Sequence, residues 1–83
     1  MADLPRLLLA LADRLDAHHG NAPMTQRLAE AQALHVTEAA HGPGAYSEHV
    51  EHHLLASLPP IQPDENRSDY AGRLRGLAEG VSA

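Results

Sequence analysis

The spacing of hydrophobic positions along the chain predicts four helices. Apolar residues recur three and four positions apart in four segments, as they do on one face of an α-helix. We expect helices over about residues 4–19, 23–41, 45–58 and 67–80, within a single helical domain spanning 1–83. The connection 59–65 is too rich in proline to continue a helix. The pattern predicts an all-α fold, a compact small four-helix domain with short loops and a Pro-rich crossover before the last helix.

The first and last helices have the clearest patterns. The apolar stripes comprise Leu4, Leu7, Leu8, Leu11 and Leu15 in the first, and Tyr70, Leu74, Leu77, Ala78 and Val81 in the last. Gly20 is a plausible residue to end the first helix, and Asn66 is well placed to cap the fourth. Leu9 lies off its stripe, beside acidic residues. We expect it to be either an isolated exposed leucine or a contact with another subunit or partner.

The second helix is rich in alanine and has a weaker pattern. The apolar face that we assign comprises Met24, Leu28, Ala31, His35 and Ala39, with Leu34 to one side. Val36 would project elsewhere. His35 lies in the middle of this face, so we expect it to be a buried, hydrogen-bonded residue that is uncharged at pH 7. The segment Gly42-Pro43-Gly44 should end the helix firmly.

The predicted third helix has two contrasting faces. One face is apolar and comprises Val50, Leu54, Leu55 and Leu58. The opposite face, called here the histidine face, carries His49, His52 and His53. We expect the apolar face to pack against the core. The histidine face would meet solvent, a partner or a second subunit, or a metal ion.

The amino-acid composition restricts how this fold can be stabilised. The chain has 83 residues, with no Cys, Trp or Phe, so its core must be built mainly from Leu and Ala. Helix packing suits these residues, whereas β-sheets favour β-branched and aromatic ones. A chain of this size buries a modest share of its surface, which makes a homodimer a sensible expectation.

The charge argues against nucleic acid as a partner. The formal net charge is −5, and phosphate binding requires a basic face. Protonating all seven histidines while the carboxylates stay ionised would reverse the sign of this charge, so the net charge is expected to respond to mildly acidic pH. The apolar run 7–12 is too short for a signal peptide, and no stretch approaches the length of a membrane span. We therefore expect a cytoplasmic protein with no membrane partner.

The histidine face is the candidate metal site. His49 and His53 lie four positions apart, and His49 and His52 three apart, so either pair could share one zinc or nickel ion. The string HVEHH is not the metalloprotease motif HExxH, because Val50 follows the first histidine. A third ligand would have to come from another helix. We expect no resident cofactor.

No motif assembles a catalytic site. Gly42-Pro43-Gly44 lacks the pattern of a phosphate-binding loop, and the serines have no nucleophile-elbow context. We expect a non-catalytic protein-interaction module, such as a small regulator, an inhibitor or a subunit of a larger assembly. It would bind another protein or itself through Leu9 and the residues His49, His52 and His53. The alternative is a metal-binding or pH-responsive protein that uses the same histidines.

Overall fold

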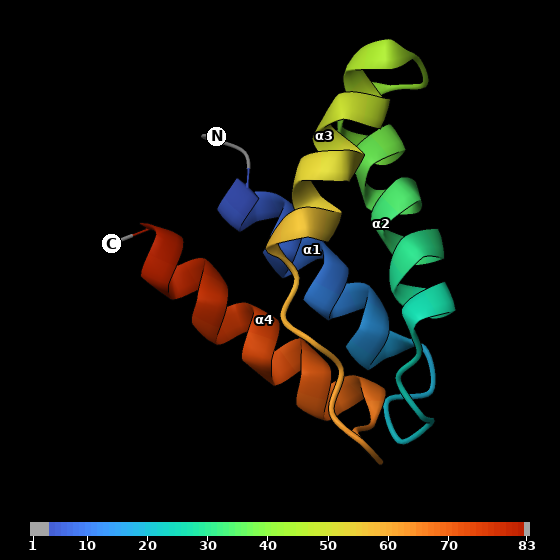
Figure 1. Cartoon of the computed structure of the whole chain (residues 1–83), viewed down its shortest axis with the longest axis vertical. Helices are drawn as coiled ribbons and strands as arrows, with labels where there is room; N and C mark the ends of the chain where they lie inside the picture. The colour runs from blue at the N-terminus through green and yellow to red at the C-terminus, as the bar shows by residue number, and fades with distance from the viewer. Residues whose placement is uncertain (1–3, 83) are drawn as a thin grey trace.

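The computed structural model describes residues 4–82, with side chains as far as Gly80, and its described part is all-α (Figure 1). The helices are α1 (Leu4–Ala17), α2 (Gln26–His41), α3 (Ala45–Ser57) and α4 (Arg67–Ser82). No strand occurs in this part of the chain, although Pro23 and Asn66 form one isolated bridge. The prediction of a small four-helix domain is confirmed. Val81, which we predicted to lie on the apolar stripe of the last helix, is outside the described side chains.

Helix α1 is central to the packing. Among residues 4–82 it is the helix that contacts all three others, whereas α4 packs against α1 alone. Figure 1 shows α1 and α4 side by side, with α2 and α3 forming a second, antiparallel pair. The predicted leucine stripe of α1 is confirmed, because four of its members are almost fully buried: Leu7, Leu8, Leu11 and Leu15.

The other helices bury the faces that pack toward α1. The predicted stripe of α4 is confirmed at Tyr70, Leu74 and Ala78, and Leu77 packs at its edge. In α3, Val50 and Leu54 are fully buried as predicted. Leu9 of α1 is 43% exposed and lies outside this core.

The predicted face of the second helix is correct only at its start, where Met24 is buried and Leu28 packs against the core, and the rest of it is wrong. The structure buries Ala29, Ala33, Val36 and Thr37. His35 is exposed, and so are Ala31 and Ala39, so the prediction of a buried His35 is wrong. Alanine fits a core or a surface equally well, and the pattern therefore could not fix the rotation of this helix. Thr37 can be buried because its hydroxyl donates a hydrogen bond to the carbonyl of Ala33.

The ends of α2 are set by local chemistry. The helix begins three residues later than predicted, because Thr25 is its N-cap and its side chain accepts a hydrogen bond from the Leu28 N–H (3.1 Å). At the other end, Gly42 has φ = 75° and Gly44 has φ = 132°. These conformations suit glycine and account for the sharp turn into α3.

The loop between α1 and α2 caps the start of α4. The N–H of Arg67 donates to the Ala22 carbonyl (3.0 Å), and the N–H of Ser68 donates to the Gly20 carbonyl (2.9 Å). The Asp69 N–H donates to Oδ1 of Asn66 (2.7 Å), which confirms the predicted cap. The first free N–H groups of α4 are thus satisfied from within the chain.

Gly20 has a different role from the predicted one. The positive φ after α1 falls on His19 (56°), not on Gly20. A Cβ atom at position 20 would instead overlap the hydroxyl of Ser68. Gly20 therefore lies where the α1–α2 loop and α4 approach each other closely, and a larger residue would force the Ser68 side chain to move.

The connection 58–66 is held by buried polar groups. The Tyr70 hydroxyl donates to the Pro59 carbonyl (2.7 Å). The Glu65 carboxylate accepts hydrogen bonds from the Gln62 N–H (3.0 Å) and the Arg73 guanidinium (2.7 Å). Burial disfavours the charged form of Glu65, but the bonds from Gln62 and Arg73 outweigh it and lower its pKa below the ordinary 4.5.

The lowered pKa of Glu65 predicts a pH dependence. A carboxylate that binds protons less readily in the folded state stabilises the fold above pH ~4.5, and this contribution is lost as the pH falls further. We expect Glu65→Gln to lower the free energy of unfolding by about 1–2 kcal/mol at pH 7. Urea unfolding between pH 3 and pH 7 should show a flatter acid loss for this variant. Parallel curves for the variant and the parent protein would contradict the prediction, and Glu79→Gln, at an exposed site, is the control.

Candidate functional site

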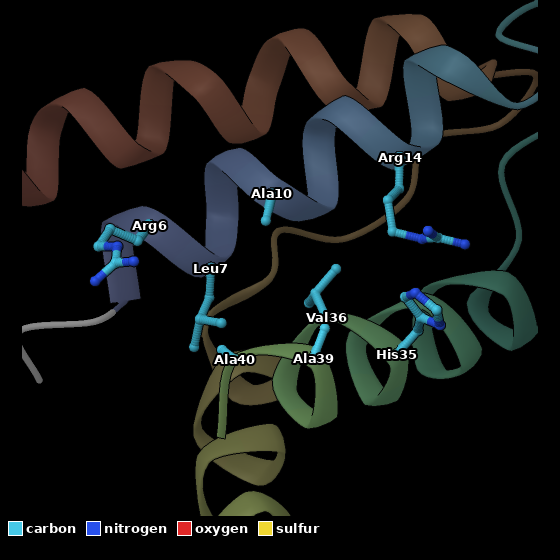
Figure 2. A pocket seen from close by; sticks show the side chains of 8 residues that line it. All are labelled: Arg6, Leu7, Ala10, Arg14, His35, Val36, Ala39 and Ala40. Carbon is cyan, nitrogen blue, oxygen red and sulfur yellow. The ribbon is translucent and has the colours of Figure 1, made fainter. Parts of the chain in front are cut away.

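An open groove of about 330 Å³ runs between α1 and α2 (Figure 2). Its lining residues are Arg6, Leu7, Ala10, Arg14, His35, Val36, Ala39 and Ala40. The two helices run in opposite directions, because Arg14 near the end of α1 bonds to Gln32 in the first half of α2, whereas Leu7 near the start of α1 lies beside Ala40 at the end of α2. The groove is thus a long feature that follows both helices.

Small residues are the reason that the groove is open. Figure 2 shows Ala10 between the two arginines of α1, with Ala39 and Ala40 on the facing helix. Their short side chains leave space above Leu7 and Val36, which are buried and form an apolar floor. The groove therefore offers apolar surface flanked by longer polar side chains.

The polar side chains that line the groove within residues 4–82 are two arginines and one histidine. Arg6 and Arg14 lie at its two ends, and His35 lies opposite Arg14 (Figure 2). Among the described residues 4–82, no Asp or Glu lines the groove, and neither arginine forms an ion pair with a carboxylate. In a chain with a net charge of −5, this is a local reversal of sign. The groove is complementary to an apolar segment that carries acidic groups.

Two smaller depressions extend the groove between α1 and α2. One, of about 120 Å³, adds His18, Leu28 and Arg67 beyond Arg14. The other, of about 90 Å³, adds His41 beyond Arg6. Within residues 4–82, neither is lined by a carboxylate. Arg67 thus adds a third arginine beyond the Arg14 end of the groove.

The sequence reasoning missed the groove. The spacing of Arg6, Ala10 and Arg14 at i, i+4 and i+8 was a usable signal, because these positions share one side of a helix. His35 was singled out, but it lies at the groove and not in the core. Leu9 is exposed and does not line the groove.

The histidine face points away from the core. His49, His52 and His53 are all exposed, opposite the buried Val50 and Leu54. The rings of His49 and His53 lie edge to face, with centroids 5.2 Å apart. Within the described part of the chain, no three ligand-type side chains are grouped so that they could hold a metal ion. A metal held here would need a further ligand from outside residues 4–82.

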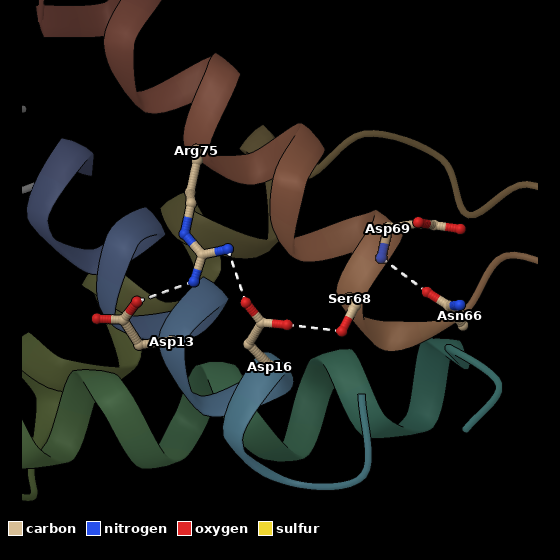
Figure 3. A network of polar contacts seen from close by, with 6 residues as sticks. All are labelled: Asp13, Asp16, Asn66, Ser68, Asp69 and Arg75. Atoms are coloured by element: carbon tan, nitrogen blue, oxygen red, sulfur yellow. Dashed lines mark hydrogen bonds and ion pairs between the residues drawn. The ribbon is translucent and has the colours of Figure 1, made fainter. Parts of the chain in front are cut away.

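A second polar cluster links α1 to α4 (Figure 3). Arg75 contacts Asp13 (3.0 Å) and Asp16 (2.9 Å), and the Ser68 hydroxyl donates to Asp16 (2.6 Å). The hydrogen bond from Ser68 and the contact with Arg75 lower the pKa of Asp16. Each charged group already has a partner, so the cluster serves to align the two helices. Being exposed, it adds little stability.

Comparisons with known proteins give no relative for this chain. No family model matches it, and no curated protein and no solved structure is similar to it. None of the helices in the described part is long and apolar enough to cross a membrane.

The exposure of the histidine face predicts weak effects of substitution. We expect His49→Ala, His52→Ala and His53→Ala each to change the free energy of unfolding by less than ~0.5 kcal/mol. Leu54→Ala, on the buried side of α3, should cost ~2–5 kcal/mol and serves as the comparison. Calorimetric titration of the protein with zinc should show weak binding without a fixed stoichiometry. Sub-micromolar binding of one zinc ion per chain, lost in His49→Ala, would contradict this account.

Proposed function

We propose that this protein is a non-catalytic protein-interaction module that binds through the α1–α2 groove. It would act as a small regulator, an inhibitor or a subunit of a larger assembly. The observation that carries the proposal is the groove itself, which combines an apolar floor with a rim of Arg6, Arg14 and His35 and has no lining carboxylate among the described residues. The groove replaces Leu9 and the histidine face as the main binding surface in this proposal.

The form of the groove supports a helical partner. Recognition of an amphipathic helix commonly uses a groove between two helices, in which apolar side chains enter the floor and charged ones meet the rim. Arginine is over-represented in protein interfaces, where it combines an apolar stem with a charge. Arg6 is exposed and Arg14 is half-buried, so both guanidinium groups are accessible to a partner.

The hydroxyl groups of the helices support a role without catalysis. Ser47 and Ser57 donate hydrogen bonds to the carbonyls of Gly42 and His53, respectively. Ser68 donates to the Asp16 carboxylate. A nucleophilic serine is instead activated by an adjacent base. The hydroxyl groups of these three serines instead donate hydrogen bonds within the fold.

The setting proposed for this module is the cytoplasm, with a protein as partner and with neither nucleic acid nor membrane. The absence of cysteine is compatible with a reducing compartment. The net charge of −5 opposes binding to phosphate backbones.

The histidine face supports a second proposal. The contact between the rings of His49 and His53 places two potential zinc or nickel ligands on one exposed helical face. A partner that supplied the remaining ligands, or an acidic partner that favoured protonated histidine, would make α3 a metal-dependent or pH-responsive surface.

Filling the groove tests the main proposal. Ala10→Trp places a large ring between the two arginines and should reduce partner affinity more than tenfold, while the helix content stays unchanged. Ala56→Trp makes the same change at an exposed alanine of α3 and should leave binding intact. The measurement is capture of partners from a lysate of the producing cells, followed by titration of a purified partner. Equal binding by the parent protein and both variants would contradict the proposal.

A further inference from the structure

We infer that the α1–α2 groove receives helix α2 of a second copy of this chain. The inference rests on the proposed function, since it names the partner of the same groove. It starts from a second surface on α2, the α2 stripe, which comprises Glu30, Leu34 and Glu38. All three side chains are exposed, and Leu34 is among the large apolar residues that the fold leaves uncovered, at 40% exposure.

The stripe and the groove match in spacing. Glu30, Leu34 and Glu38 are separated by four residues each, and so are Arg6, Ala10 and Arg14. At 1.5 Å per residue, the outer members of each set lie about 12 Å apart along their helix. With Leu34 of one copy over Ala10 of the other, both glutamates reach an arginine in either direction of the helix.

The stripe and the groove also match in size and charge. Leu34 is a large apolar side chain that is partly exposed to solvent. Ala10 has a short side chain and leaves space above the apolar floor of the groove. The two carboxylates of the stripe oppose the two guanidinium groups of the groove, which lack a carboxylate partner within residues 4–82. An interface with an apolar centre and ion pairs at its rim is a common arrangement.

The stripe and the groove lie on different sides of α2. At 3.6 residues per turn, Leu34 and Ala39 are about 140° apart around the helix, so a pair of chains uses one stripe and one groove. A further copy can add in the same head-to-tail manner, so the association should grow with concentration. Arg27 lies one turn before Glu30, so in the dimer its positive charge would approach the arginines of the partner's groove. Arg27→Gln removes this repulsion and should therefore tighten the dimer.

Charge reversal in two separate variants tests the inference. The first variant is Glu30→Arg with Glu38→Arg, and the second is Arg6→Glu with Arg14→Glu. Each variant alone places like charges on its stripe and its groove, so each should be monomeric by sedimentation. An equimolar mixture restores opposite charges between the stripe of each variant and the groove of the other, and should sediment as a dimer or a larger species. The parent dimer should weaken between ~0.1 M and ~1 M salt, where the Debye length falls from about 10 Å to 3 Å.

A matched control separates this effect from net charge. Glu48→Arg with Glu79→Arg changes the net charge as the first variant does, at exposed sites on α3 and α4, and should leave the dimer intact. Circular dichroism checks that every variant keeps its helices. A parent protein that stays monomeric at ~1 mM, or a mixture that stays monomeric although both variants are folded, would overturn the inference. If Ala10→Trp still abolishes capture of a different protein in that case, the proposed function stands without the dimer.

Discussion

The burial of α1 is the constraint on which the rest of this structure depends. Four leucines of this helix are almost fully buried: Leu7, Leu8, Leu11 and Leu15. Each contributes roughly 1.5–3 kcal/mol of burial free energy, and without Phe or Trp few other side chains supply as much. The other three helices therefore pack around α1, which is the only helix that α4 contacts within residues 4–82. The loss of α1 would leave two helical units with no shared core.

The alanine content of α2 connects this packing to the candidate site. On the inner side, Ala29 and Ala33 bury almost completely. On the outer side, Ala39 and Ala40 do not fill the space beside α1, and Ala10 leaves the same space open from the other helix. The groove thus arises from the same short side chains that let the chain form a core from Leu and Ala. Arg6 and Arg14 then give the groove its positive charge.

The sequence predicted those parts of the fold that depend on local pattern. The leucine stripe of α1, the apolar face of α3 and the Asn66 cap follow from spacing and capping chemistry within single segments. The face of α2 was not predictable in the same way, because alanine gives little contrast between core and surface. The environment of Glu65 and the close approach at Gly20 depend on segments distant in sequence, and no local pattern indicates them. The candidate site needed α1 and α2 to be placed together before its charge could be recognised.

In the proposed self-association, α2 of one chain occupies the groove of another. The most direct measurement is an isotope-filtered NOE experiment on a mixture of labelled and unlabelled chains, which detects contacts between two copies. The account predicts intermolecular NOEs from the Leu34 methyl groups to the methyl groups of Ala10 and Ala39. Intermolecular NOEs confined to Leu9 or to α3 would contradict it, and so would the absence of any at millimolar concentration.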